Sequence, residues 1–151
     1  MKNVIVADID DCCLSPNGRI QHYLNGDLER YHAEHHTDEP IPQGIAVYRK
    51  FLNDANFRFY FVTGRNEDAR QYTLDQLHAH IDPAIVSKQL LMRPIHLPST
   101  VMHDTELKPM LLRQIGIEPK HIFIVFEDRT SVVNMWRALG VMVYQTALGN
   151  H

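Results

Sequence analysis

Residues 4–12 have the sequence VIVADIDDC, an apolar run that ends in two carboxylates spaced two residues apart. The run is typical of a buried parallel strand, because such strands are covered on both faces and are continuously aliphatic. Open α/β sheets bind their ligands at the carboxyl ends of the strands, so Asp8 and Asp10 are expected at that edge. A solvated acidic turn after a strand is the alternative interpretation.

The spacing of the two carboxylates predicts a divalent cation beside them. Two unit negative charges about 4 Å apart repel each other by roughly 4 kcal/mol at an effective dielectric constant near 20. A substrate phosphate would add to that repulsion. Because oxygen ligands favour a hard ion, Mg²⁺ is the expected cofactor.

Length and composition predict one compact domain over residues 1–151, since the chain is 44% hydrophobic. The formal net charge of −3 is not that of a tight, nonspecific nucleic-acid binder. Cys12 and Cys13 are the only cysteines, and adjacent cysteines are poorly placed to form a disulfide. We find no signal peptide and no membrane span, so we expect a soluble, cytoplasmic protein without a membrane partner.

The rest of the chain alternates strand and helix patterns. Strands are predicted at residues 57–62, 89–93, 121–126 and 141–144, and helices at about 42–52, 66–80, 107–115 and 130–139. This order predicts an α/β fold, a three-layer, Rossmann-like parallel sheet of about five strands with helices on both faces and no large cap domain.

Residues 15–42 are polar and are expected to form a small cap-like insertion, a long loop with one helix over residues 24–35. His32, His35 and His36 have helical spacing within it. A metal site would explain them, but no cysteine nearby completes one, so a solvated or pocket-facing helix is favoured.

Polar groups follow two further predicted elements. Thr63, Gly64 and Arg65 offer a hydroxyl, a backbone N–H and a guanidinium, which suit an oxyanion. A plain strand-to-helix turn with Thr63 as the cap is the alternative. Lys108 is expected at the beginning of a helix, where a cation opposes the helix dipole, so either a phosphate partner or an accidental surface position explains it.

Glu127 and Asp128 place acidic groups at the end of another predicted strand. Polar groups at four such positions, in this order, resemble the haloacid-dehalogenase-like superfamily of phosphohydrolases over nearly the whole chain. The four motifs of that family are matched by Asp8-Ile9-Asp10, Thr63, Lys108 and Glu127-Asp128. The family commonly has Gly-Thr after its second aspartate, whereas this chain has Asp11-Cys12, so the local turn is expected to differ.

A closer likeness extends over residues 126–141, 91–93 and 103–104. These segments are similar to the 3′-phosphatase domain of phage-type polynucleotide kinase/phosphatases. The sequence has no Gly-x-x-x-x-Gly-Lys-Ser/Thr stretch, so phosphorylation of 5′ ends by this chain alone is not expected. The resemblance implies a Mg²⁺-dependent phosphomonoesterase of nucleic-acid repair that removes 3′-phosphates through an aspartyl-phosphate.

The resemblance also implies a role for each matched residue. Asp8 is the nucleophile, Asp10 the general acid and base, and Lys108 the cation that stabilises the transferred phosphoryl group. Substrate contacts are expected from Thr63, Gly64, Arg65 and Arg93, with Asp104 orienting Lys108. The expected metal ligands are Asp8, the Asp10 backbone carbonyl and Asp128, which is favoured over the other candidate, Glu127.

Two alternatives remain open from the sequence. A 5′- or 3′-deoxyribonucleotidase would act on free nucleoside monophosphates, which the same crevice would also admit. An inactive, phosphatase-like module would only bind nucleic acid or a protein, its activity lost through the Asp11-Cys12 change. The expected partners are a phosphorylated nucleic-acid end or a nucleotide, and a separate kinase or ligase chain.

Overall fold

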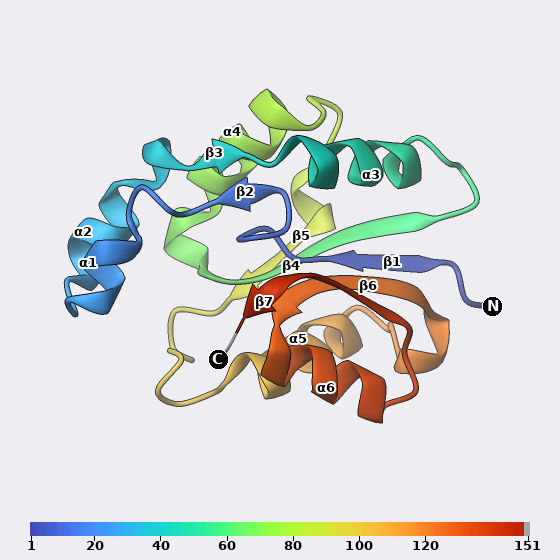
Figure 1. The fold of residues 1–151 in the computed structure, drawn as a ribbon. Helices are drawn as coiled ribbons and strands as arrows, with labels where there is room; N and C mark the ends of the chain where they lie inside the picture. The colour runs from blue at the N-terminus through green and yellow to red at the C-terminus, as the bar shows by residue number, and fades with distance from the viewer. Residues whose placement is uncertain (150–151) are drawn as a thin grey trace.

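The computed structural model describes residues 1–149, so residues 150 and 151 of the expected domain lie outside the described part. Its centre is a five-stranded sheet in the order β5-β4-β1-β6-β7 (Figure 1). The strands are β1 (Val4–Ala7), β4 (Arg58–Asn66), β5 (Leu90–Arg93), β6 (Ile122–Arg129) and β7 (Val143–Gly149). All of their pairings are parallel, which confirms the expected fold class.

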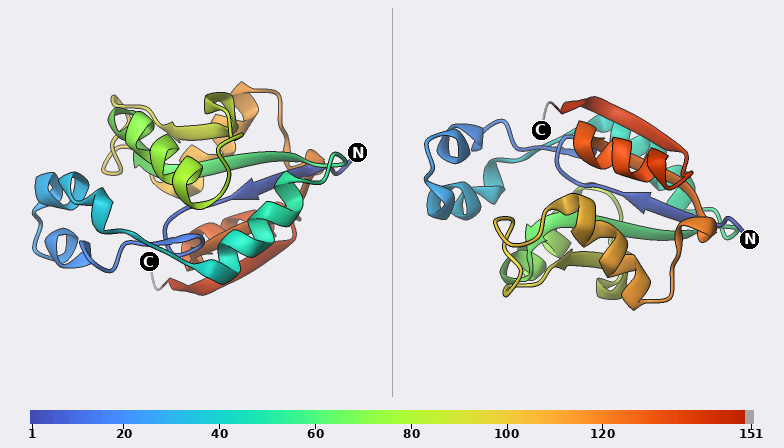
Figure 2. Two further views of the ribbon diagram at one scale, coloured as in Figure 1. Left: turned by 90° about the horizontal axis from the view of Figure 1, so that it is seen from above. Right: turned by 90° about the horizontal axis from the view of Figure 1, so that it is seen from below.

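Helices cover both faces of the sheet (Figures 1 and 2). The helices α3 (Pro42–Leu52) and α4 (Arg70–His80) lie on one face, and α5 (Asp104–Gln114) and α6 (Thr130–Ala138) on the other. Because side chains alternate along a strand, β1 sends Ile5 and Ala7 into the first core and Val4 and Val6 into the second. The aliphatic run of β1 is therefore buried on both sides, as expected for a central parallel strand.

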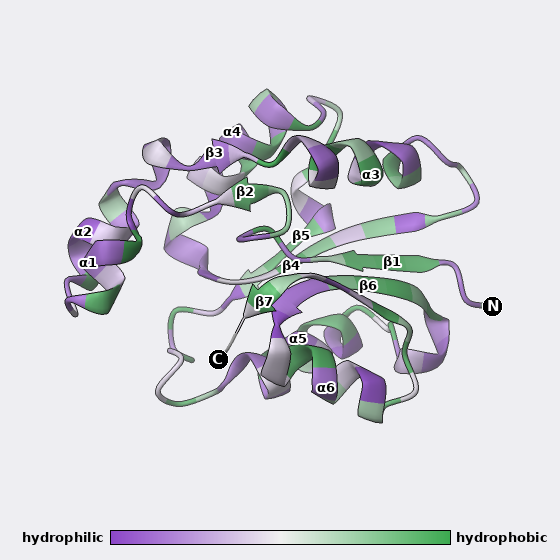
Figure 3. Cartoon of the chain, in the orientation of Figure 1, coloured by the Kyte–Doolittle hydropathy of each residue, from purple (hydrophilic) through white to green (hydrophobic). Residues whose placement is uncertain are grey.

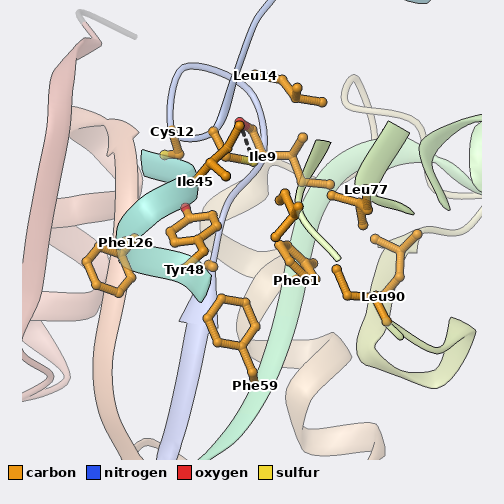
Figure 4. Close-up of a cluster of buried hydrophobic side chains, with 14 of the residues drawn as sticks. Ile9, Cys12, Leu14, Ile45, Tyr48, Phe59, Phe61, Leu77, Leu90 and Phe126 are labelled. Atoms are coloured by element: carbon orange, nitrogen blue, oxygen red, sulfur yellow. Dashed lines mark hydrogen bonds between the residues drawn. The ribbon is translucent and has the colours of Figure 1, made fainter. Parts of the chain in front are cut away.

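The core under α3 is built around the ring of Tyr48 (Figure 4). Its centroid lies 5.5 Å from that of Phe59, 6.0 Å from that of Phe61 and 5.5 Å from that of Phe126. Tilted and edge-to-face pairs of this kind add about 0.5–1.5 kcal/mol each beyond the area that they bury. The Tyr48 hydroxyl donates a 2.7 Å hydrogen bond to the backbone carbonyl of Asp8, so this core fixes the end of β1.

The insertion at residues 15–42 differs from its prediction. It contains two short helices, α1 (Ile20–Leu24) and α2 (Leu28–Ala33), and the 3₁₀ helix η1 (His35–Thr37), so the single helix expected at 24–35 is wrong. Gly26, at φ +76°, follows α1, and Asp27 begins the next helix by accepting a 3.1 Å hydrogen bond from the Arg30 N–H.

The insertion is joined to the body by a pair of short strands. The strands β2 (Leu14–Ser15) and β3 (Glu39–Pro40) pair antiparallel and bring the two ends of the insertion together. The insertion projects from the body at the carboxyl end of β1 (Figure 2). It therefore lies beside the edge where chemistry is expected.

Several other boundaries differ from the prediction, and β6 also continues past its predicted end, to Arg129. Helix α5 begins at Asp104 rather than Leu107, because the His103 side chain caps it by accepting a 3.2 Å hydrogen bond from the Thr105 N–H. Lys108 thus lies in the second turn, and the helix-dipole argument about it is wrong. Strands β4 and β7 continue beyond their predicted ends, to Asn66 and Gly149. Within residues 1–149, no helix combines the length and apolarity that a membrane crossing requires.

Candidate active site

The ends of β1 and β6 and the second turn of α5 meet at one edge of the sheet. The Lys108 ammonium lies 3.2 Å from a carboxylate oxygen of Asp8 and 2.5 Å from one of Glu127. All three residues are buried. Residues that are far apart in the sequence are therefore joined by buried ion pairs, and the carboxylates at the ends of β1 and β6 lie together.

Acidic groups crowd the Asp8 side of this site. Burial and the nearby carboxylate of Glu127 raise the pKa of Asp8 well above its ordinary value, although Lys108 opposes the shift. Burial and the proximity of Asp8 likewise raise the pKa of Asp128 to about 7. A cation placed among these carboxylates would relieve both costs.

The side chains at this position fit a divalent cation. Carboxylate oxygens of Asp8 and Asp128 and the Cys12 sulfur all lie within 4.8 Å of one another. Two carboxylates provide the hard oxygen ligands that Mg²⁺ prefers. Glu127 is used differently: one oxygen accepts from Lys108, and the other accepts from the N–H groups of Asp128 and Arg129 at 3.1 and 3.2 Å.

The turn after Asp10 explains how Asp11 can stand where the family commonly has glycine. Asp11 has a φ of +60°, in the left-handed region that glycine favours and that aspartate enters more readily than most residues. The N–H groups of Cys12, Cys13 and Leu14 all donate to the Ile9 carbonyl, at 3.0–3.2 Å. The departure at position 11 is therefore compatible with a closed, hydrogen-bonded turn.

Asp10 faces cations rather than carboxylates. Arg65 donates to both oxygens of its carboxylate, at 3.0 and 2.7 Å, and Arg19 donates to one of them at 3.4 Å. Burial would raise the pKa of Asp10, but the charge and hydrogen bonds of Arg65, together with Arg19, lower it to about 2. Asp10 is therefore held ionised.

The same two arginines meet Asp38, whose side chain is completely buried. Arg19 donates to its two oxygens at 2.6 and 3.0 Å, and Arg65 donates to one of them at 2.9 Å. Gln76 on α4 adds a donor at 3.3 Å. Because Arg19 and Asp38 belong to the insertion, this ion-pair cluster attaches the insertion to the site.

Sequence reasoning missed this cluster, since Arg19 and Asp38 lie in a segment whose other residues are mostly polar and exposed. It placed Arg65 beside the phosphate instead. In the structure the Arg65 guanidinium donates to Asp10 and Asp38 and, on its other side, to Thr73 and Gln76. A contact between Arg65 and phosphate stays a prediction.

A second group of side chains packs against the last residues of β4, after Thr63. Arg93 donates to the carbonyls of Gly64, Leu97 and Met102 at 3.1, 2.9 and 2.6 Å. It also donates to the Asp104 carboxylate. A Cβ at position 64 would lie 2.8 Å from both carboxylate oxygens of Asp104, so any larger residue there would have to displace this carboxylate. This packing fixes the end of β4, where Thr63 lies.

Asp104 and Arg93 thus have structural contacts that the sequence did not indicate. Asp104 also pairs with Arg129 at 3.1 Å, and it acts on Lys108 through its charge, which helps to raise the pKa of that amine. Within residues 1–149, the Lys108 ammonium donates its hydrogen bond to Glu127 rather than to Asp104. The Thr63 hydroxyl accepts from the Arg65 N–H at 3.1 Å, and Thr63 is buried within β4. Phosphate contacts from Thr63, Gly64 and Arg93 stay predictions.

The extended end of β7 supplies a support that was also missed. The Gln145 amide donates to the Asp128 carbonyl at 3.0 Å and to the Thr130 hydroxyl at 3.1 Å. The Thr146 hydroxyl donates to the Asp11 carbonyl at 3.1 Å and lies 3.0 Å from the Cys12 sulfur. The prediction ended this strand at Tyr144, so these contacts lay beyond it.

Comparisons with known proteins identify a family that this chain matches. A family model described as the polynucleotide kinase PNKP phosphatase domain matches residues 2–151. No curated protein matches the sequence. A chain from the structure of the Pnkp1/Rnl/Hen1 complex is similar with a TM-score of 0.70 and 21% identity, over 100% of this chain and 48% of that one. This chain thus spans about half the length of that neighbour.

Two further solved structures share the fold. A HAD family hydrolase from Deinococcus radiodurans R1, with bound phosphate and sodium, is similar with a TM-score of 0.63 and 12% identity, over 95% of this chain and 80% of that one. The class C acid phosphatase from Bacillus anthracis gives a TM-score of 0.62 and 14% identity, over 97% and 67%. At these identities the likeness establishes the architecture.

Proposed function

Since the chain belongs to the family of polynucleotide kinase PNKP phosphatase domains, we propose that it removes 3′-phosphates from polynucleotide ends. It is a phosphatase of the haloacid-dehalogenase type. The observation that carries the proposal is the placement of Asp8 between the Lys108 ammonium, 3.2 Å away, and the Asp128 carboxylate. Such a group can bind a phosphate, attack it and balance its charge.

In the first step, an Asp8 oxygen attacks phosphorus, and the bond from phosphorus to the 3′-oxygen breaks. This gives an aspartyl-phosphate and a free 3′-hydroxyl. Lys108, together with Thr63 and Gly64 of β4, stabilises the charge on the equatorial phosphoryl oxygens. A bound Mg²⁺, held by Asp8, Asp128 and the Asp10 carbonyl, would neutralise the charge that phosphate and carboxylate bring together.

Asp10 gives a proton to the leaving oxygen and then takes one from the water that hydrolyses the aspartyl-phosphate. Its ionised state in the structure suits the second step. For the first step the proton can arrive with the substrate, because the second pKa of a phosphomonoester is about 6. The charge that Arg65 and Arg19 impose on this carboxylate therefore favours its role as the base, and its role as the acid depends on the proton that the substrate brings.

The test compares phosphate release from a 3′-phosphorylated oligonucleotide and from deoxynucleoside monophosphates, each with Mg²⁺. The Asp8→Asn variant is the negative control. We expect the larger kcat/KM for the oligonucleotide. Faster turnover of mononucleotides would make the protein a nucleotidase instead. Failure to hydrolyse even p-nitrophenyl phosphate would make it the inactive binding module.

Partners and compartment form part of the proposal. The 151-residue sequence has no Gly-x-x-x-x-Gly-Lys-Ser/Thr stretch, so a kinase activity would come from a separate polypeptide segment. The similar chain of the Pnkp1/Rnl/Hen1 complex, about twice as long, supports a kinase or ligase chain as partner. Two buried free thiols support a reducing cytoplasm.

A further inference from the structure

The two helices of the insertion bury none of their residues. Large side chains on them face solvent: Tyr23 is 52% exposed, Leu24 67% and Leu28 51%. Figure 3 shows hydrophobic positions among the hydrophilic ones on these helices. Several exposed large side chains on one projecting element are typical of a surface that binds another molecule.

Aromatic rings follow one another from this insertion to α4, and we name Tyr23, Tyr31, His32, His35 and Tyr72 the aromatic track. The centroids of successive rings lie 5.4, 5.3, 6.0 and 5.2 Å apart. Its two end rings, Tyr23 and Tyr72, are 52% and 36% exposed, so each has open surface.

The aromatic track adjoins the site described above. The Arg19 guanidinium lies 4.3 Å over the centroid of the Tyr31 ring, and the same group donates to the Asp10 carboxylate at 3.4 Å. Only one side chain therefore separates the track from the carboxylate that serves the leaving oxygen. A chain attached to that oxygen would leave the site beside these rings.

We propose that the aromatic track binds the bases of a single-stranded nucleic-acid end while its terminal phosphate lies at Asp8. This inference rests on the proposed function and adds the part of the protein that holds the rest of the substrate. Aromatic side chains stack on any base, since every base has a π-face, and they do so without sequence preference. The open surfaces of Tyr23 and Tyr72 provide the stacking sites.

Charge on the insertion favours bases over backbone as the bound group. Residues 15–42 contain two arginines, Arg19 and Arg30, and five acidic residues, Asp27, Glu29, Glu34, Asp38 and Glu39, which gives 2 − 5 = −3. Such a segment has little to attract the phosphate backbone. Binding through stacking predicts a shallow dependence on salt, because few counterions are released from the nucleic acid.

The experiment uses three substrates: a single-stranded 3′-phosphorylated hexanucleotide, the same chain with abasic sugars, and p-nitrophenyl phosphate. Wild-type protein is expected to have a lower KM for the intact chain than for the abasic one. The double variant Tyr23→Ala/Tyr72→Ala is expected to raise the KM for the intact chain by roughly five- to a hundredfold for each stacked base lost. Its kinetics on the other two substrates should be unchanged.

Two controls separate stacking from a structural effect. Tyr23→Phe/Tyr72→Phe keeps both rings and is expected to restore the wild-type KM. Phe123→Ala removes a 43% exposed ring at the opposite end of the sheet and is expected to change none of the three reactions. Loss of activity on all three substrates in the double alanine variant would assign these tyrosines to folding and overturn the proposal.

The remaining outcomes distinguish this inference from the function on which it rests. If wild-type protein releases phosphate from intact and abasic chains with equal KM, the 3′-phosphatase function stands and the aromatic track has no part in it. If it hydrolyses p-nitrophenyl phosphate but neither chain, both proposals fall.

Discussion

Asp8 and Asp10 stand two residues apart but lie in opposite electrostatic surroundings. Asp8 is packed with Glu127 and Asp128, and its pKa is raised. Asp10 is held by Arg65 and Arg19, and its pKa is lowered to about 2. A nucleophilic carboxylate must be ionised, so a cation bound among Asp8, Glu127 and Asp128 would have to lower the raised pKa of Asp8 before it could attack. The body of the protein sets the first environment, and the insertion helps to set the second.

Removing the Asp8 carboxylate should have the largest effect. Asp8→Asn is expected to lower kcat by at least about 10⁴-fold, because it removes the attacking oxygen. The fold should persist, since one of the crowded negative charges is lost. Phosphate release measures kcat, and circular dichroism of the same sample measures whether the fold persists. Wild-type activity in this variant would exclude Asp8 as the nucleophile.

Asp10→Asn tests the other half of the pair. For a 3′-phosphorylated oligonucleotide we expect a loss of roughly 10²–10⁴-fold, the usual contribution of general acid catalysis. The loss should be much smaller for p-nitrophenyl phosphate, whose leaving group needs no proton. Equal losses on the two substrates would contradict the role of Asp10 in proton transfer.

Breaking the cluster that surrounds Asp10 should reduce stability. Asp38→Asn leaves two buried arginines without part of their countercharge, which is expected to cost about 3–5 kcal/mol of unfolding free energy. Glu34→Gln is the matched control, because Glu34 pairs with the well-exposed Arg30 and with His22 in the same insertion, and solvent-screened pairs of this kind contribute little to stability. Urea denaturation measures both variants. Similar losses of unfolding free energy in Asp38→Asn and Glu34→Gln would show that the buried cluster does not stabilise the insertion.

The smallest expected effect concerns pH and metal on the Asp8 side. The pKa of Asp128 is about 7 in the folded protein against 3.8 for the ordinary group, so metal-free protein loses stability as pH rises from about 4 to about 7. Mg²⁺ should offset this loss, and its effect on the melting temperature should be larger at pH 8 than at pH 5.5. Expressed as unfolding free energy, Asp128→Asn should reduce that difference by an amount on the order of 1 kcal/mol. An unchanged difference would place the cation elsewhere.

The sequence predicts the Asp8 side better than the Asp10 side, and the reason is physical. Asp8 and Asp128 follow aliphatic strands, so the rule that parallel strands end at one edge brings them together. Lys108 was identified although its helix begins three residues earlier than expected, at a histidine cap. Periodicity carries no such information about Arg19 and Asp38, because in a polar segment a buried ion pair has the same residue types as a solvated surface. The supports from β7 were missed for a similar reason, since Gln145 and Thr146 have the polarity of a loop.

The pairing of β2 with β3 has a consequence for how this protein family can diversify. Leu14 lies opposite Pro40 and Ser15 opposite Glu39, so the chain leaves and re-enters the body at neighbouring points. A segment inserted at such a neck can be lengthened, shortened or exchanged while the sheet keeps its register. Replacing the insertion with one from another protein should therefore change the substrate preference. Each replacement would need an aspartate and an arginine in the places of Asp38 and Arg19 to form the ion-pair cluster with Arg65.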